Sequence, residues 1–574
     1  MRSFILIRVL LAALLSTGLT FAQDGPDTGE HPDWPRWCGK VYESGYPSFE
    51  PGGHTVAPPT NGSTFLYVQF KPRYSLYLST ETKASFVVNA ALSPWFGEEY
   101  ANATSDGVST DPFTELVFSI NLVADDILLV EDRIGVNATG AEFEFDLSGL
   151  EPRLTPYEVV LIGSSVHGDH SYTATSELLY LPDNAEGSAT KIDHVRGGLL
   201  FKNAQTENKF VPLLPYGYYG LYNGSNDTAA SDEFVRDYTS NGEGLNAIIS
   251  LAGFADTNPV YDSMDEQGLH FMFDLRGSYK NLTETEQRVN TIKHHTSLFA
   301  YWTADEPDGW QVPFDKTPAA QALIHKLDPY HPVAITLNCQ DYYFGPYAAG
   351  GDILMEDVYP IGINSTFSKW GTACNTTLGD CGCDNCQGGI QDVPSRLDDL
   401  AQYEAWLGRW PLPKFHNPQV FHGEDYWFRD PTAAEARAMN ALAFNRGATG
   451  IFGWTWPSSE DLFSAHSQMA GIVTRAPVAD FLLSGKPERL VVEGYEILDA
   501  AYWIEGNRLM VSVVNGGYED IEESVSIALP VSATDIESVA FGGLSWQLLD
   551  GRLVADELPA VSTSFIILNL DAMG

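Results

Sequence analysis

The chain has 574 residues, a formal net charge of −44, a hydrophobic content of 44% and an aromatic content of 12%. This composition supports large packed cores and excludes a chain that is disordered throughout. A surface this acidic repels phosphate backbones, so nucleic acid and strongly anionic polymers are not expected as partners.

The first 22 residues predict a secretory signal peptide. Arg2 and Arg8 precede an apolar run over residues 9–19, and Ala22 ends a stretch suited to cleavage. The run is shorter than the roughly 20 residues that span a bilayer, and no later stretch reaches that length. We therefore expect a secreted, extracellular protein with no membrane association after cleavage.

The sequence also contains acceptor sites for N-glycosylation, which agree with export. Each is an asparagine followed by x-Ser or x-Thr without an intervening proline. The eight acceptors are Asn61, Asn102, Asn137, Asn223, Asn226, Asn281, Asn364 and Asn375.

Six cysteines predict disulfide bonds rather than a zinc knuckle, because an exported chain meets an oxidising compartment. Fifteen pairings are possible, and the sequence does not choose among them. Four of the six lie within one short segment, so we expect the bonds to pin one long loop. The cysteines are Cys38, Cys339, Cys374, Cys381, Cys383 and Cys386.

Taken in chain order, residues 23–190 predict an N-terminal β-sandwich. Their apolar segments are short, rich in β-branched and aromatic residues, and separated by Gly, Pro, Asn and Asp. Residues 486–574 show the same alternation and predict a small C-terminal β-sandwich.

Residues 191–485 alternate between candidate strands and helices. Thr283 with Glu286 predicts a capping box, and Thr317-Pro318 and Asp430-Pro431 predict two further helix starts. Eight such repeats predict a (β/α)8 barrel, of which the fifth repeat is the weakest. The candidate strands are Phe210–Tyr216, Leu245–Leu251, Leu269–Leu275, Leu298–Ala304, Pro332–Asn338, Asp352–Val358, Pro418–Glu424 and Thr449–Trp456.

The fourth strand runs into a pair of carboxylates, Asp305 and Glu306. Functional groups of such barrels gather at the carboxyl ends of the strands. Trp302 and Trp310 flank Glu306 in sequence, and aromatic surroundings raise the pKa of a carboxyl group, as a general acid requires. The other interpretation is that Glu306 caps the helix that follows.

The seventh strand is predicted to end at Glu424 and Asp425. In a barrel the fourth and seventh strands face each other across the mouth, so two carboxyl groups can lie about 5 Å apart there. We interpret Glu424 as a nucleophile, with Asp425 as its competitor. A simple ion pair with Arg429 is the alternative.

Further candidate residues for binding a sugar lie at other strand ends. Asp357 after the sixth strand is expected to bind a hydroxyl or position Glu424, unless it only closes a loop. Arg276 forms either a salt bridge with Asp274 or a contact with hydroxyls. Flat aromatic faces pack against pyranose rings. The whole predicted binding set is Asp305, Asp357, Tyr359, Trp427, Trp454, Trp456, Tyr218 and Arg276.

These motifs resemble clan A glycoside hydrolases, the retaining superfamily that includes families 2 and 5. In that clan an acid/base glutamate ends the fourth strand, usually within Asn-Glu-Pro, and a nucleophile glutamate ends the seventh. Glu306 and Glu424 match those positions, and Trp454 or Trp456 matches a tryptophan at the end of the eighth strand. Asp305 departs from the usual asparagine, since an ionised acid accepts but cannot donate a hydrogen bond.

The resemblance and the residues together predict a secreted retaining glycosidase acting on a neutral oligo- or polysaccharide, with no metal or organic cofactor. One alternative is an inverting enzyme with Asp357 or Asp425 as base, which requires carboxyl groups roughly 6.5–9.5 Å apart. The other is a non-catalytic glycan-binding protein.

Overall fold

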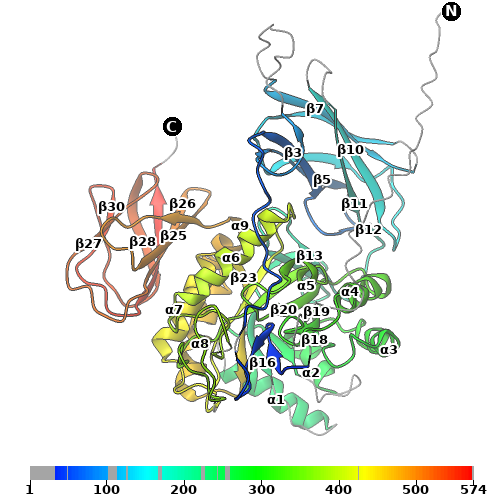
Figure 1. Cartoon of the computed structure of the whole chain (residues 1–574). Coiled ribbons are helices and arrows are strands. Elements are labelled where there is room, and N and C mark those ends of the chain that lie inside the picture. Colours follow the sequence, from blue (N-terminus) through cyan, green and yellow to red (C-terminus); the bar gives the residue numbers. More distant parts are fainter. Residues whose placement is uncertain are drawn as a thin grey trace, which may run out of the picture.

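The computed structural model describes residues 33–571 apart from 48, 101–112, 125–126, 166–170, 221–226, 242–243, 252–258, 380 and 425. The predicted signal peptide therefore lies outside the described residues. Figure 1 shows three parts: an N-terminal β-sandwich above a central barrel, and a C-terminal β-sandwich beside the barrel. Among the described residues, no helix has the length and apolar character needed to cross a bilayer.

The N-terminal sandwich consists of two four-stranded antiparallel sheets, with strand orders β6-β3-β5-β9 and β11-β10-β7-β8. Alternate residues of β3 and β7 are buried, which is the pattern of a strand with one face on a core. The strands are β3 Phe65–Pro72, β5 Lys83–Ser93, β6 Glu98–Glu99, β7 Glu115–Leu122, β8 Leu128–Gly135, β9 Ala141–Asp146, β10 Tyr157–Ser165 and β11 Ser171–Leu178.

Residues that precede and follow this sandwich lie against the barrel. The segment before it carries two short strands, β1 Arg36–Trp37 and β2 Lys40–Val41. This dark blue segment runs down across the barrel in Figure 1. After the sandwich come β12 Tyr180–Leu181, which pairs with β4 Tyr77–Leu78, and a three-stranded sheet of β13 Ala189–Ile192, β14 Leu199–Lys202 and β15 Val211–Leu213.

The central part is a closed barrel of eight parallel strands, which confirms the predicted (β/α)8 fold. The barrel strands are β16 Tyr216–Gly220, β17 Ala247–Ser250, β18 His270–Asp274, β19 Leu298–Asp305, β20 Val333–Leu337, β21 Ile353–Asp357, β22 Lys414–Asn417 and β23 Ala448–Trp456. Helices follow the strands: α1 Thr228–Asn241, α2 Pro259–Gln267, α3 Leu282–Ile292, α4 Lys316–Leu327, α5 Phe344–Ala348, α6 Asp392–Trp406, α7 Ala433–Phe444, α8 Glu460–Val473 and α9 Val478–Ser484.

Two strand predictions are wrong, and the second error involves proline. The first barrel strand is β16, because residues 211–213 belong instead to the small sheet outside the barrel. The seventh is β22, which ends at Asn417, immediately before Pro418. A proline nitrogen cannot donate to the ladder, so the short run between Pro413 and Pro418 is the strand.

The helix starts also differ from prediction. Helix α3 is capped by Asn281 rather than Thr283, α4 begins at Lys316, and the capping box of α7 is Thr432 with Glu435. The weak fifth repeat contains the five-residue helix α5. Several side chains near each helix start are able to cap it, so the sequence does not determine the exact first residue of the helix.

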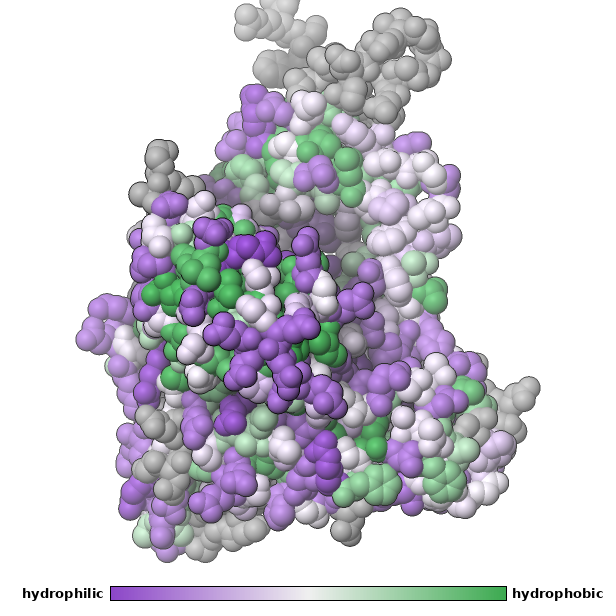
Figure 2. Space-filling model, turned by 90° about the vertical axis from the view of Figure 1, so that its left-hand side faces the viewer, coloured by the Kyte–Doolittle hydropathy of each residue, from purple (hydrophilic) through white to green (hydrophobic). Residues whose placement is uncertain are grey.

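The C-terminal part packs a five-stranded sheet, ordered β24-β25-β26-β31-β28, against a three-stranded sheet, ordered β27-β30-β29. Its strands are β24 Glu488–Leu490, β25 Leu498–Glu505, β26 Arg508–Asn515, β27 Val525–Ala528, β28 Ala533–Phe541, β29 Gln547–Leu549, β30 Arg552–Ala555 and β31 Thr563–Leu570. The face shown in Figure 2 is mostly hydrophilic, with apolar patches between polar side chains.

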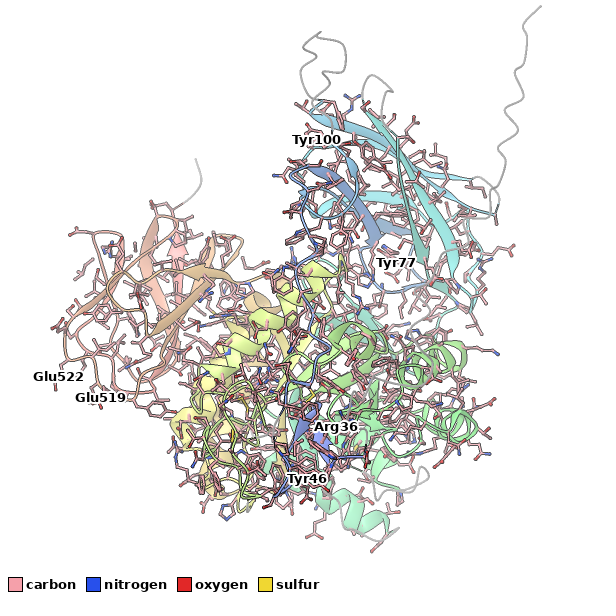
Figure 3. All side chains as sticks on the ribbon, viewed as in Figure 1. Arg36, Tyr46, Tyr77, Tyr100, Glu519 and Glu522 are labelled. Carbon is pink, nitrogen blue, oxygen red and sulfur yellow. A yellow bond between two sulfur atoms is a disulfide. The ribbon has the colours of Figure 1, made fainter. Side chains whose placement is uncertain are left out.

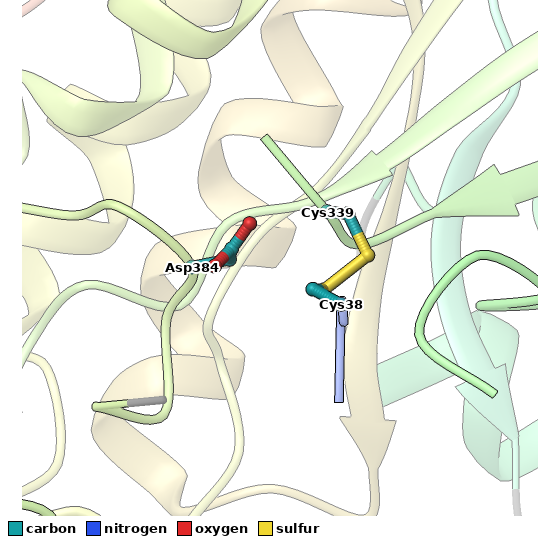
Figure 4. Close-up of side chains that lie close together, drawn as sticks. All are labelled: Cys38, Cys339 and Asp384. Atoms are coloured by element: carbon teal, nitrogen blue, oxygen red, sulfur yellow. A yellow bond between two sulfur atoms is a disulfide. The ribbon is translucent and has the colours of Figure 1, made fainter. Parts of the chain in front are cut away.

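Three disulfides are present, and only part of the cysteine prediction holds. Cys374–Cys381 and Cys383–Cys386 pin the loop after β21, as expected. Cys38–Cys339 instead joins residues 301 positions apart and ties the N-terminal segment to the loop after β20. Figure 4 shows this bond between the two segments.

Candidate active site

The interior of the barrel is apolar until the last residue of several strands. Phe415 of β22 and Met355 of β21 belong to the interior cluster. Because side chains alternate along a strand, the residues two positions further on, Asn417 and Asp357, face the same interior at the carboxyl ends. Thr336, two residues after the interior residue Ala334 of β20, follows the same rule. A polar layer therefore closes the barrel.

Glu306 lies at this end of the barrel, directly after β19. Its backbone adopts a left-handed conformation with φ of 48°, and its amide donates to the carbonyl of Thr336 at 3.0 Å. Its side chain is half-buried. Asn338 donates from Nδ2 to Glu306 Oε1 at 2.9 Å. Glu306 is therefore held by the neighbouring strand and still reaches the surface of the site.

Asp357 is the carboxylate that lies against Glu306. A hydrogen bond between the two carboxyl groups is among the causes that raise the pKa of Glu306, after burial and the charges of Asp305, Asp357 and Asp308. Asp357 is 5% exposed and accepts a hydrogen bond from Asn417 Nδ2 at 2.7 Å. Two carboxyl groups can share such a bond only while one of them is protonated.

The two members of this pair differ in their surroundings. Burial raises the pKa of Asp357 well above its usual value, and the charge of Asp305 raises it further. Hydrogen bonds from Asn417 and Tyr359 act in the opposite direction on Asp357. The largest causes at Glu306 all raise its pKa and outweigh the hydrogen bond that Asn338 donates to it. Glu306 is therefore the member of the pair that carries the proton. Asp357 is the member whose ionised form is better stabilised by hydrogen bonds.

Asp305 and Arg276 form the charged edge of the site. Arg276 Nη1 lies 3.2 Å from Asp305 Oδ2, and its Nε lies 3.1 Å from Asp274 Oδ2. The salt-bridge interpretation of Arg276 is thus what the structure shows. Burial raises the pKa of Asp305 to about 6, with Arg276 opposing the rise. Arg276 also lies over the ring of Trp302, 5.2 Å from its centroid.

Aromatic side chains pack beneath the polar layer at this end of the barrel. Tyr219 packs edge-on against Trp302 and Trp454, with ring centroids 4.9 and 5.2 Å apart. Its hydroxyl accepts a hydrogen bond from Asn417 at 2.8 Å. Trp427 donates from its indole nitrogen to the carbonyl of Tyr359 at 2.9 Å, which places the loop after β22 beside this cluster.

Two predicted sugar-binding residues do not lie in this group. Tyr218 is fully buried and packs on Phe463 and His466 of α8. Trp456 packs on Phe234 and Tyr238 of α1. Both therefore belong to the layer between the strands and helices. Neighbouring residues of a strand face opposite sides, which separates Tyr218 from Tyr219. A register shift between β16 and β23 turns Trp456 away from the side that Trp454 faces. Tyr219 takes the interior position instead of Tyr218.

Glu424 lies in the loop after β22, seven residues beyond the strand end, and is exposed. It is not among the charges that shift the pKa of Glu306. Asp425, its predicted competitor, lies outside the described residues. The end of the seventh strand is held by Asn417, an amide that sequence reasoning missed because it placed the strand too late.

The site has further members that the sequence did not single out. Asn338 and Asn417 each donate to one carboxyl of the pair. Asp308 accepts backbone hydrogen bonds from Gly309 and Cys339, both at 2.9 Å, and so joins the loops after β19 and β20. The sequence does offer a signal for these residues, because they are amides and acids at or near the ends of barrel strands. It can be used only when the strand ends are predicted correctly.

One described cavity, of about 460 Å³, is not at this site. Pro332, Asp352 and Pro413, which precede β20, β21 and β22, line it together with sandwich residues such as Lys71. It therefore lies between the N-terminal sandwich and the amino ends of the barrel strands, opposite the carboxyl pair.

Among the described residues, the group with metal-ligand spacing is Cys38, Cys339 and Asp384. The two sulfurs are joined in a disulfide and are not thiolate ligands (Figure 4). Lys40 lies 2.5 Å from Asp384 and neutralises its charge. This group is therefore a structural contact between the N-terminal segment and the barrel.

No protein-family model and no curated protein sequence matches the chain. Solved structures that resemble it carry glycoside hydrolase names. A putative alpha-galactosidase from Bacteroides fragilis is 11% identical with a TM-score of 0.42, covering 91% of this chain and 99% of that one. A GH30 endoxylanase from Clostridium papyrosolvens is 11% identical with a TM-score of 0.38, covering 62% and 96%.

An FMN-binding beta-glucuronidase from Facaelibacterium prausnitzii is 12% identical with a TM-score of 0.33, covering 89% of this chain and 71% of that one. Identities and TM-scores at this level do not carry over an activity or a substrate. The function is therefore derived from the carboxyl pair and its surroundings.

Proposed function

We propose that this protein is a glycoside hydrolase whose two working carboxyl groups are Glu306 and Asp357. The observation that carries the proposal is that Glu306 and Asp357 interact at the carboxyl end of the barrel, where Glu306 is half-buried and Trp454 packs on Tyr219. Barrel enzymes place their chemistry at this end. Most glycoside hydrolases use a pair of carboxyl groups to cleave the glycosidic bond.

In the proposed reaction Glu306 protonates the leaving oxygen while Asp357 attacks the anomeric carbon. The C–O bond to the leaving group breaks as the ester bond to Asp357 forms. Glu306, now ionised, removes a proton from water, whose oxygen displaces Asp357 and restores both groups. Asn417 and Tyr359 orient Asp357 and support its negative charge.

The contact between the carboxyl groups favours retention over inversion. An inverting enzyme holds its carboxyl groups roughly 6.5–9.5 Å apart to admit a water molecule between base and sugar. Carboxyl groups that interact as directly as Glu306 and Asp357 leave little such space. Glu424 as nucleophile, which the sequence predicts, remains a competing proposal that the same experiment tests.

A neutral glycan is the proposed substrate class. Asp305, Glu306 and Asp357 give the opening an acidic character that Arg276 offsets only in part. An anionic sugar would meet this charge at close range. Flat faces such as that of Trp454 suit the apolar face of a pyranose ring.

We also infer export and N-glycosylation. Asn61, Asn137, Asn281, Asn364 and Asn375 are exposed, as an acceptor requires. Asn102, Asn223 and Asn226 lie outside the described residues. The three disulfides support an oxidising compartment.

The test begins with a screen of aryl glycosides and neutral polysaccharides against the wild type. Glu306→Gln, Asp357→Asn and Glu424→Gln are then compared for hydrolysis and for sugar binding by calorimetry. Glu522→Gln, exposed on the C-terminal domain (Figure 3), is the matched control. We expect the first two variants to lose roughly 10²–10⁴-fold in kcat while binding is kept.

Two results would overturn the assignment. Loss of hydrolysis in Glu424→Gln with full activity in Asp357→Asn would transfer the second role to the loop after β22. A wild type that binds glycans but hydrolyses none would make the protein a glycan-binding module.

A further inference from the structure

The described residues of the segment 33–55, here called the strap, lie on the barrel although they precede the N-terminal sandwich in the chain. Arg36 and Tyr46 of the strap lie over the barrel in Figure 3, whereas Tyr77 and Tyr100 mark the sandwich above it. The strap reaches the loops after β19 and β20. Gln311, in the loop after β19, donates from its side chain to the carbonyl of Arg36 at 3.3 Å.

Trp37 is the strap residue that touches the site. Its indole Nε1 lies 2.9 Å from Oδ1 of Asn338, and the Nδ2 of the same amide lies 2.9 Å from Glu306 Oε1. The ring packs edge-on against Trp310, with centroids 4.6 Å apart. A Cβ on Gly309 would lie 2.6 Å from the Trp37 ring, so this loop is shaped around the indole.

The indole settles which way the Asn338 amide points. An indole N–H can only donate, so it selects the amide oxygen and turns the NH₂ group toward Glu306. The reversed amide would face Glu306 with an oxygen, which could only accept the carboxyl proton. The carboxyl proton of Glu306 would then be hydrogen-bonded to Asn338 and could not be donated to a leaving group.

The position of Trp37 is itself fixed by the chain. Cys38, the next residue, is disulfide-bonded to Cys339, the residue after Asn338. Lys40 forms a buried ion pair with Asp384, 2.5 Å away, in the loop after β21. The residues that follow Trp37 and Asn338 are thus covalently joined. This bond holds the indole and the amide within hydrogen-bonding distance.

We propose that Trp37 is a positioning residue for Glu306, acting through the amide of Asn338 and held in place by the Cys38–Cys339 disulfide. This inference rests on the proposed function for its catalytic consequence. The hydrogen-bond relay itself is a property of the folded chain and can be measured without any substrate.

The expected effect concerns the proton of Glu306. Asn338 donates to the carboxylate and so favours the ionised form, whereas a reversed amide would favour the protonated form. Loss of the indole N–H therefore raises the pKa of Glu306. Among the described residues, the titratable and charged groups around Glu306 are Asp305, Asp308, Asp357 and Tyr359, with Arg276 beyond Asp305 and Arg396 bonded to the carbonyl of Asn338. A Trp37 variant replaces none of them.

The experiment uses the full chain with Trp37→Phe, which keeps an aromatic ring and removes the N–H. Trp34→Phe is the matched control, because Trp34 packs on Tyr46 and Phe49 within the same strap. A water-soluble carbodiimide labels protonated carboxyl groups, and tandem mass spectrometry locates the label on Glu306 across a pH series. We expect the labelling midpoint to move to higher pH in Trp37→Phe and to stay in place in Trp34→Phe.

A second measurement follows hydrolysis. We expect kcat of Trp37→Phe to fall roughly tenfold, a part of the 10²–10⁴-fold that a general acid contributes, with KM nearly unchanged. The alkaline limb of its pH profile should move in the same direction as the labelling midpoint. A purely structural role would lower activity without moving that limb.

The Cys38→Ser/Cys339→Ser double variant tests the clamp and should reproduce the shift of Trp37→Phe. An unmoved labelling midpoint in Trp37→Phe would overturn the relay, and an unmoved midpoint in the double variant would overturn the role of the disulfide. If the midpoint moves but no glycan is hydrolysed, the relay stands and the proposed function fails. The two failures are therefore distinguishable.

Discussion

Around Glu306 the described residues include the carboxyl groups of Asp305, Asp308 and Asp357 and the guanidinium of Arg276. Burial raises the pKa of both Asp305 and Asp308 to about 6, and raises those of Glu306 and Asp357 further above their usual range. Each acid is thus more easily protonated in the folded state than in the unfolded chain. The arrangement retains a proton for catalysis at some cost in stability at neutral pH.

Asp357→Asn should therefore stabilise the protein at neutral pH. A raised folded-state pKa means that the folded state binds the proton more tightly, so stability is present below the ordinary aspartate pKa and is lost as pH rises toward the folded value. The variant removes this loss and still offers an oxygen to Asn417. We expect a gain of about 1 kcal/mol in the free energy of unfolding at pH 7.

Denaturant unfolding of wild type and variant at pH 7 and at pH 3 measures this gain. At pH 3 the difference should vanish, because the wild-type carboxyl is then protonated in both states. Glu522→Gln should show no difference at either pH. A variant that is less stable than wild type at pH 7 but equal to it at pH 3 would refute the expectation.

Among the elements, helix α7 shows how hydrogen bonds at a helix start connect a barrel helix to the preceding loop and to the C-terminal sandwich. The hydroxyl of Thr432 accepts from the amide of Glu435, and the carboxylate of Glu435 accepts from the amide of Thr432 at 2.8 Å. Arg429 and Tyr518 also bond to this carboxylate, at 2.7 and 2.8 Å. These partners lower the pKa of Glu435 to about 2, although burial opposes them.

Glu435→Gln should destabilise the protein by about 1–3 kcal/mol at pH 7, because it removes charge-assisted hydrogen bonds from a buried group. A lowered folded-state pKa gives stability above the ordinary glutamate pKa that is lost as pH falls toward 2. The destabilisation should therefore shrink between pH 5 and pH 2. Thermal unfolding over that range measures it, and a loss that stays constant with pH would contradict the role of the charge.

The barrel elements show how far the sequence predicts this fold. Six of the eight strands lie within about two residues of their expected bounds, because apolar runs between turn residues locate buried strands well. β22 could not be placed in this way. Its four residues lie between prolines, and the apolar residues after Pro418 resemble a strand more closely.

That single displacement accounts for most of what the sequence missed in the site. With β22 ending at Asn417, the pair across the mouth becomes Glu306 with Asp357 rather than with Glu424. The strap is a different case. Nothing in the sequence near Trp37 indicates contact with a residue 301 positions away, since that contact depends on tertiary packing and on a disulfide pairing that the sequence left open.

In the whole molecule, a buried ion pair joins the C-terminal sandwich to the barrel. Arg446 after α7 donates to Asp499 of β25 at 2.6 and 3.1 Å, and Asn445 donates to the same carboxylate at 2.8 Å. Asp499 is 8% exposed. Breaking a buried pair by removing one partner leaves an uncompensated charge.

Arg446→Ala should therefore destabilise the contact between the barrel and the C-terminal domain by about 3–5 kcal/mol. Hydrogen exchange of β25 and calorimetric unfolding measure this directly, as faster exchange and an earlier transition. Lys83→Ala, which removes an exposed ion pair with Glu144 in the N-terminal sandwich, is the matched control and should change little. Equal effects of the two substitutions would show that the pair with Asp499 does not hold the domain.

The pairing of Glu306 with Asp357 is tested most directly by trapping the covalent intermediate. Once the screen identifies a hydrolysed aryl glycoside, its 2-deoxy-2-fluoro analogue slows the second step, and the labelled peptide is sequenced by mass spectrometry. The glycosyl group should be found on Asp357. A label on Glu424 would contradict the account and place the nucleophile in the loop after β22.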